Sequence, residues 1–328
     1  MNSAIVLNNE GYEPFLDFLK GLCIISVVLT HNIPYVWQNV IGFPFWGAQA
    51  VPIFLIIQSY HVFKRNEFRL NIYSLLRRIV LPFILIQSIF IIEIFVKYFC
   101  GSGLLTTPIL NFIKSGGEGP GSYYFWIYLE FALVLLPLCF SIQKHLKFKL
   151  YVCLLAFTFV SELAEILCSF IELKPWLYRL LAFRYIFLVF GGIIWAKHGI
   201  VLNKFCLILS IISVVCIYLF QYKKVSFEPW VFDTEWRYFH WFCYFYSICL
   251  LSFIANKSYR VIQGGVFAIL VSKCGKYSYQ IYLLQLVVFS FFPYDCNKML
   301  YLVSTTVLSI VPVLLYYKIK SKCLTIVK

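Results

Sequence analysis

The sequence predicts an all-α protein, a polytopic bundle of transmembrane helices. Hydrophobic residues make up 62% of the chain and charged residues only 13%, with a mean hydropathy of +0.83. A soluble domain averages about 25% charged residues. Apolar runs of about 17 residues or more, which suffice for a helix to cross a bilayer, recur along the chain. Because these runs are continuous and not alternating, they favour helices over a transmembrane β-barrel.

We predict about ten spans within a single integral-membrane domain that covers residues 1–328. The first run is long and ends without a small-residue cleavage signal, so we expect a retained helix and not a signal peptide. The second contains Pro52 and is polar at Gln49 and Gln58, which makes it the weakest of the set. The predicted spans are 15–35, 45–63, 79–99, 123–143, 150–170, 180–197, 204–220, 239–255, 277–293 and 299–317.

The positive charges follow the alternation of these spans. Nineteen lysines and arginines fall on one side of the predicted membrane and nine on the other. Cytoplasmic loops carry the excess of such residues, so both termini are predicted to be cytoplasmic. The net charge of +14 is therefore explained by orientation in a lipid bilayer, and no nucleic-acid partner is expected. The twelve cysteines form no CxxC pair, which predicts small core residues and no metal site.

Two predicted outer loops are longer than the rest. Residues 101–122 are rich in Gly and Ser, which predicts a flexible or gating segment. Residues 221–238 combine tryptophans with acidic residues, among them Trp230 and Asp233. Such a mixture suits contact with sugar rings, although an aromatic belt at the membrane interface explains it equally well.

The first predicted span carries three ionisable side chains, Asp17, Lys20 and His31. Such groups are costly in hydrocarbon, so each is a candidate functional residue. Lys20 and His31 are eleven residues apart, which places them on nearly one helix face with a rise of about 16 Å. A neutral imidazole can take a proton from a hydroxyl and return it. Alternatively, His31 is a hydrogen-bonded packing residue between helices.

Arg77 and Arg78 precede the third span on its predicted cytoplasmic side. Guanidinium groups match phosphate oxygens, so this pair is a candidate phosphate site. Simple anchoring of the helix by positive charge is the alternative.

Further polar residues lie within the predicted spans and fit either a catalyst or a proton-coupled transporter. Gln58 and His61 are three residues apart and share a helix face. Acidic side chains recur in later spans, and a tyrosine-rich stretch before Gln285 opens the ninth span. The acidic residues are Glu93, Glu130, Glu162 and Glu165.

Four motifs, taken in chain order, resemble those of one known family. They are Leu16–Leu22 leading to His31, the apolar stretch Val51–Ile56, Arg77 and Arg78 before Pro82, and Tyr277–Leu284. Together with the ten-span plan they resemble the acyltransferase 3 family, the integral-membrane O-acyltransferases that modify bacterial surface polysaccharides. The chain departs from the family pattern at three places. Leu75 stands where a second spaced Arg is usual, Gln58-Ser59 stands for Ser-Gly, and Gln285 stands for a His.

The resemblance implies a membrane enzyme of the bacterial inner membrane that takes an acetyl group from cytoplasmic acetyl-CoA. The acceptor would be a hydroxyl of a cell-surface glycan or of its lipid-linked oligosaccharide precursor. Arg77 and Arg78 would hold the donor's phosphates. His31 would act as general base or acyl carrier, oriented by Lys20 and Asp17.

In the same reading Gln58, His61, Glu130 and Gln285 would bind substrate or support the site. The alternative is a non-catalytic transporter or exporter of acyl groups or glycan precursors, which the loss of the late His at Gln285 favours slightly. A polysaccharide polymerase fits less well, because the outer loops are modest in size.

Overall fold

The structure is a computed structural model, and it describes residues 14–65, 71–101, 105–146, 180–199, 204–223, 243–254, 264–292 and 298–326. Every regular element in these ranges is helical, which confirms the predicted all-α class for the described part of the chain. The chain divides into two compact units. The first comprises Met1–Phe68, Leu135–Glu172 and Phe183–Ser278, and the second comprises Arg69–Val134, Leu173–Ala182 and Tyr279–Lys328.

Four helices in the described ranges are long and apolar enough to cross a membrane. They are Pro14–Asn32, Ile72–Phe99, Tyr123–Ile142 and Met299–Lys320. Shorter apolar helices occupy Ile186–Lys197, Cys206–Tyr222, Tyr244–Phe253 and Ser278–Phe291. All of these coincide with predicted spans. The prediction for 150–170 lies outside the described residues, and the count of ten spans and the cytoplasmic termini stay predictions.

In the first unit, helix α1 (Pro14–Asn32) packs directly on α15 (Val266–Lys276). At each point of closest approach, a glycine of one helix lies against a backbone carbonyl of the other. A Cβ added to Gly275 would lie 1.6 Å from the Asp17 carbonyl oxygen, and one added to Gly21 would lie 1.9 Å from the Val271 carbonyl oxygen. Small residues allow such close helix crossings in membranes. The sequence analysis did not predict α15.

Helix α3 (Ala50–Lys64) is the second organising element of this unit, and α11 (Ile186–His198) packs along it. A Cβ on Gly192 would lie 2.2 Å from that of Ser59, so this crossing also depends on a glycine. Tyr60 stacks on Trp195 with ring centroids 4.1 Å apart. Pro52 falls in the first turn of α3, where its missing N–H leaves no hydrogen bond unmade.

The N-terminal end of α3 is tied to the rest of the unit by side-chain hydrogen bonds. Gln49 donates from Nε2 to the Pro44 carbonyl over 2.8 Å and accepts a hydrogen bond from the Ser247 hydroxyl. Further helices of the first unit are α2 (Tyr35–Val40), the 3-10 turns η1 (Phe43–Phe45) and η4 (Phe183–Tyr185), α8 (Leu136–Leu146), α12 (Lys204–Tyr222) and α13 (Tyr244–Phe253).

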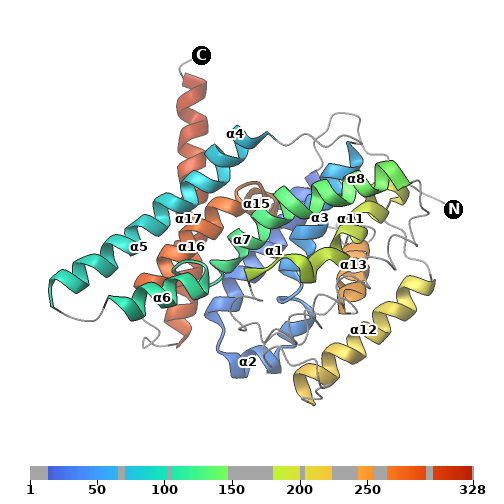
Figure 1. Cartoon of the computed structure of the whole chain (residues 1–328), viewed down its shortest axis with the longest axis horizontal. Helices are drawn as coiled ribbons and strands as arrows, with labels where there is room; N and C mark the ends of the chain where they lie inside the picture. The colour runs from blue at the N-terminus through green and yellow to red at the C-terminus, as the bar shows by residue number, and fades with distance from the viewer. Residues whose placement is uncertain are drawn as a thin grey trace. The chain divides into compact units, whose positions relative to one another are not determined.

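The second unit opens with one continuous helix of 28 residues, visible as the long ribbon labelled α4 and α5 in Figure 1. It comprises α4 (Ile72–Leu75), the π-helical segment η2 (Leu76–Val80) and α5 (Leu81–Phe99). The unit continues with α6 (Thr106–Ser115), α7 (Tyr123–Glu130), α16 (Ser278–Phe291) and α17 (Lys298–Ile326). A second π-helical segment, η3 (Phe131–Leu135), follows α7 and leads into α8.

Both π-helical segments have the same local cause. Each is followed directly by a Leu-Pro pair, Leu81-Pro82 after η2 and Leu136-Pro137 after η3. Proline has no N–H to donate to the preceding turn, and its ring crowds the carbonyl four residues earlier. The turn before it widens, and the Leu81 N–H bonds to the carbonyl of Leu76, five residues back. The helix thus continues through the proline.

The Gly-rich loop between α6 and α7 is held in place, which corrects the expectation of a flexible segment for its residues 116–122. Gln87 of α5 pairs with the backbone of Glu118, donating over 3.1 Å and accepting over 2.7 Å. Trp126 Nε1 donates to the Gly116 carbonyl over 2.7 Å, and the Tyr282 hydroxyl donates to that of Gly121 over 3.0 Å. Residues 102–104 and most of the predicted loop 221–238 lie outside the described ranges.

A larger side chain at Gly275 is expected to disrupt the first unit. Gly275→Leu forces α1 and α15 apart and should destabilise the protein by about 3 kcal/mol or more, since overpacking alone costs about 1–3 kcal/mol. Thermal unfolding of the detergent-solubilised protein measures the loss. Lys273→Leu, at an exposed position of the same helix, is the control and should leave the midpoint nearly unchanged. Equal midpoints for both variants would contradict the observed crossing.

Candidate functional site

The N-terminal half of α1 carries an ion pair. Lys20 Nζ lies 2.7 Å from Asp17 Oδ1, three residues earlier on the helix. Asp17 is only 6% exposed and lies in the first turn of α1, where unpaired backbone N–H groups favour a carboxylate. Asp17 and Lys20 are therefore in direct contact, and their predicted role in orienting His31 stays a prediction. Pairing is what allows a carboxylate to be buried at this position.

His61 lies in the last turn of α3 and belongs to the same neighbourhood as this pair. Lys20 and Asp17 are among the charges that act on its imidazole. Gln58 lies one turn earlier on α3, and its Oε1 is buried without a hydrogen-bond partner among the described residues. The structure thus gathers Asp17, Lys20 and His61 at one end of the first unit, with Gln58 on the adjoining turn. The catalytic role of Asp17 and Lys20 and the substrate-binding or supporting role of Gln58 and His61 stay predictions.

His31 lies at the opposite end of α1 and is half-buried in its last turn. The helix is unbroken from Pro14 to Asn32, so its eleven-residue separation from Lys20 corresponds to about 16 Å along the axis. The two side chains are too far apart to touch. Any influence of Lys20 on His31 has to act through other groups or through a bound molecule.

The helix end that carries His31 is closed by Gln38 of α2. Its Nε2 donates to the Thr30 carbonyl over 2.9 Å and to the Ile33 carbonyl over 2.8 Å. Thr30 belongs to the last turn of α1, whose carbonyls have no partner within the helix, and Ile33 directly follows the helix end. Pro34 then directs the chain into α2. The sequence analysis did not identify Gln38, and only its position just after a predicted helix end could have indicated this role.

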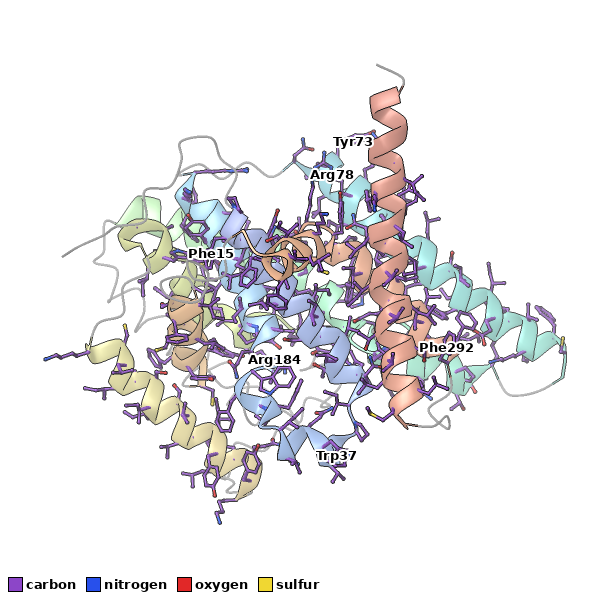
Figure 2. All side chains as sticks on the ribbon, turned by 180° about the vertical axis from the view of Figure 1, so that it is seen from behind. Phe15, Trp37, Tyr73, Arg78, Arg184 and Phe292 are labelled. Atoms are coloured by element: carbon purple, nitrogen blue, oxygen red, sulfur yellow. The ribbon has the colours of Figure 1, made fainter. Side chains whose placement is uncertain are left out.

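Arg77 and Arg78 lie in the second unit, on the π-helical segment η2, and both side chains are exposed. Figure 2 marks Arg78 near Tyr73 on this helix. The segment is joined to α16 by the Tyr279 hydroxyl, which donates to the carbonyl of Ile79, the residue after Arg78. Exposed guanidinium groups can meet a phosphate without first losing buried partners. The predicted role in donor binding is compatible with this position and is not tested by it.

Glu130 and Gln285 also belong to the second unit. Glu130 is half-buried and accepts a hydrogen bond over 2.8 Å from the backbone N–H of Ala182, so it connects α7 to a distant stretch of chain. This contact gives Glu130 a structural function. Gln285 of α16 is 0% exposed, and neither its Oε1 nor its Nε2 has a hydrogen-bond partner in the part of the chain that the structure describes. Glu162 and Glu165 lie outside the described residues.

Arg184, labelled in Figure 2, is a buried cation that the sequence analysis counted only as a loop charge. It is 1% exposed and belongs to the first unit. Its Nη2 donates to the Tyr185 hydroxyl over 2.9 Å, and its guanidinium carbon lies 4.7 Å from the centroid of that ring. Tyr185 in turn stacks on Tyr244. An arginine between aromatic residues at the start of an apolar run was the signal available in the sequence.

Comparison with protein families identifies the relationship. The family model described as an acyltransferase domain matches residues 13–318, nearly the whole chain. The chain belongs to the acyltransferase 3 family. Comparisons with curated proteins and with solved structures gave no significant match. The matched family and the apolar helices together make this protein a membrane acyltransferase.

The Lys20–Asp17 contact is expected to contribute to stability. Lys20→Met removes the cation that pairs with the buried Asp17 carboxylate. Breaking a fully buried pair costs about 3–5 kcal/mol, and Lys20 is partly exposed, so we expect a loss of about 1–3 kcal/mol. Lys97→Met is the matched control, because Lys97 pairs with Glu93 over 2.6 Å on an exposed surface. Exposed pairs contribute about 1 kcal/mol or less. Thermal unfolding in detergent should therefore show a larger loss of stability for Lys20→Met than for Lys97→Met. Adding Asp17→Asn to Lys20→Met removes the carboxylate charge and should recover part of that loss. Equal effects of the two lysine substitutions would argue against a buried pair.

Proposed function

We propose that this acyltransferase moves an acetyl group from cytoplasmic acetyl-CoA to a hydroxyl of a surface polysaccharide or of its lipid-linked precursor. It would do so as a multi-pass protein of the bacterial inner membrane. The observation that supports this most directly is α1, an unbroken helix that carries a partly buried ion pair at one end and an imidazole at the other, in a chain of this family.

In the simplest chemistry, His31 acts as a general base. Its neutral ring nitrogen takes the proton of the acceptor hydroxyl while the hydroxyl oxygen attacks the thioester carbonyl carbon. The tetrahedral intermediate then collapses with cleavage of the carbon–sulfur bond. The departing thiolate takes the proton back from the imidazolium, which yields free CoA and the O-acetyl ester. No metal is needed in this scheme.

A covalent route uses the same residue as nucleophile. The His31 nitrogen attacks the thioester carbonyl, CoA leaves as the thiol, and the acetyl group is carried on the imidazole. The acceptor hydroxyl then displaces the imidazole and takes the acetyl group. This route suits a site in which donor and acceptor approach from opposite sides of a membrane, because the carrier lies on a helix about half a bilayer away from its cytoplasmic end.

The supporting residues divide between two tasks in this proposal. Arg77 and Arg78 bind the phosphates of acetyl-CoA, while Lys20 and Asp17 fix the start of α1. Gln58 and His61 adjoin that pair and would contact substrate, and Glu130 supports the fold through Ala182. The alternative class, a transporter that moves acyl groups or glycan precursors without chemistry, predicts tolerance at His31 and sensitivity at the intramembrane glutamates.

Loss of the imidazole is expected to abolish acetyl transfer. His31→Ala should lower the rate by about 10²- to 10⁴-fold, the usual contribution of a general base, at normal protein level. O-acetyl ester in the surface glycan, measured by NMR in a strain that makes the glycan but whose own copy of the enzyme is deleted, is the readout. Thr30→Val, which removes a hydroxyl that bonds to the Ser26 carbonyl of the same helix, is the neighbouring control and should retain the ester. A normal ester content with His31→Ala would remove the catalytic role.

Removal of both η2 guanidiniums should weaken donor binding. The double substitution Arg77→Ala, Arg78→Ala is expected to raise the apparent KM for acetyl-CoA about tenfold or more, since a hydrogen bond to a charged group contributes about 1.5–3 kcal/mol. Steady-state kinetics on membrane vesicles gives the KM. Lys318→Ala with Lys320→Ala, two exposed cations on α17, is the control. Reduced membrane insertion with an unchanged KM would support the anchoring role instead.

A further inference from the structure

Gln285 differs from the other buried glutamines that the structure describes. Its carboxamide is 0% exposed, and neither polar atom has a hydrogen-bond partner in the described ranges. Gln49 and Gln87 are also buried, yet each uses both ends of its amide. Gln49 bonds to Pro44 and Ser247, and Gln87 bonds twice to the backbone of one residue. Gln58 has a buried Oε1 without a partner, whereas at Gln285 both the Oε1 and the Nε2 are unsatisfied among the described residues. Gln285 is therefore an amide that the fold uses at neither end.

An unused buried amide is unfavourable for the folded protein. Burial removes its hydrogen bonds to water, and no protein group replaces them. An apolar side chain of similar shape, such as methionine, would avoid this loss. Native structures rarely keep such groups unless a ligand, an ion or ordered water satisfies them. Gln285 is therefore placed as a group that a bound molecule would complete.

Helix α16 connects this amide with the cationic segment η2 inside the second unit. The Tyr279 hydroxyl at the start of α16 bonds to the carbonyl of Ile79, which directly follows Arg78. Gln285 lies six residues further along α16, a rise of about 9 Å. If a ligand bound its phosphates at Arg77 and Arg78, an extended arm of that ligand could reach the Gln285 side chain.

The Gly-rich loop contacts α16 on both sides of Gln285. Tyr282 donates to the Gly121 carbonyl over 3.0 Å, and a Cβ on Gly119 would lie 2.9 Å from the Leu286 carbonyl oxygen. Gln285 follows Tyr282 by three residues and so lies on a neighbouring part of that helix face. The loop therefore helps to enclose the amide.

The loop's own polar groups are already engaged. Trp126 and Ser122 donate to the Gly116 and Gly117 carbonyls, and Gln87 pairs with Glu118. These contacts fix the loop against the helices. They also leave the Gln285 amide to a partner from elsewhere.

We propose that Gln285 binds an amide group of the pantetheine arm of acyl-CoA while Arg77 and Arg78 hold the phosphates. This inference rests on the proposed use of acyl-CoA as donor. The pantetheine arm carries two secondary amides between its phosphate end and its thioester, and each offers both an N–H donor and a carbonyl acceptor. A carboxamide is complementary to either group, because it has two donors on nitrogen and an acceptor on oxygen. No acceptor sugar is needed for this contact.

The experiment compares two probes on the full-length protein purified into nanodiscs. CoA contains the arm, whereas adenosine 3′,5′-bisphosphate carries phosphates without it. Gln285→Met should lower the affinity for CoA about tenfold and leave the affinity for the bisphosphate unchanged, as measured by isothermal titration calorimetry. The ligand-free Gln285→Met protein should unfold at the same temperature as the natural protein or higher. Gln87→Met is the matched control and should unfold at a lower temperature, because it removes two formed hydrogen bonds.

Each other result overturns the inference. Unchanged CoA affinity would show that the amide does not touch the arm, and equal weakening of both probes would place the effect at the phosphates. A lower unfolding temperature for ligand-free Gln285→Met would show that the amide is a structural group. If the natural protein binds the bisphosphate and CoA with equal affinity, the arm contributes nothing and Gln285 has no such role. Failure of the natural protein to bind CoA at all would instead refute acyl-CoA as donor, which is the proposed function.

Discussion

The first unit depends on a contact between two helix backbones. Gly21 and Gly275 let α1 and α15 approach until main-chain atoms meet, and that crossing occurs at the level of Asp17. In a bilayer, helices gain little by exchanging lipid for one another, so close packing has to provide the association. The crossing encloses Phe18 together with Ala268 and Val271 of α15. It therefore fixes the end of α1 that carries the ion pair and, through an unbroken helix, the end that carries His31.

The second constraint is the pairing of polar groups where water is absent. Asp17 is buried because Lys20 lies against it, and Glu130 accepts a backbone N–H. Buried amides follow the same rule at Gln49 and Gln87. Gln285 is an exception among the described side chains, because both polar atoms of its buried amide lack a partner. An amide that the fold leaves unsatisfied is better explained by ligand contact than by packing.

Hydropathy was sufficient to predict the helical class and the long apolar helices that the structure describes. Long apolar runs identify α1, the helix from Ile72 to Phe99, and α17, because the bilayer imposes their length. Hydropathy did not predict α15, an eleven-residue helix with two lysines in its last turn. This helix contributes to the fold through the contact of its Gly275 with α1. The close backbone contact at Gly275 depends on Asp17, which is distant in sequence, so no local sequence pattern predicts it.

The candidate site was predictable to a different degree. The cost of charge in an apolar run identified Asp17, Lys20 and His31 as candidates. The contact between Asp17 and Lys20 comes from the structure. The glycine content predicted a flexible segment around Gly116, because it reflects only the conformational freedom of an isolated chain. The hydrogen bonds that Gln87, Trp126 and Tyr282 supply to this loop come from three separate helices. Arg184 was overlooked because a count of charges per loop does not distinguish a buried cation from an exposed one.

The two Leu-Pro pairs show how a local rule can position a functional residue. Pro82 removes a donor from the helix, and the wider turn that compensates is the segment that carries Arg77 and Arg78. The same solution recurs at Pro137, where the π-helical segment carries only apolar side chains. The widened turn is therefore a consequence of proline within a long helix and not of function. What is particular to η2 is that it carries two exposed cations, and that the Tyr279 hydroxyl of α16 bonds to the carbonyl of Ile79, the residue after them. A backbone feature that arises from proline thus coincides, at this one turn, with a candidate phosphate-binding pair that is tied to a neighbouring helix.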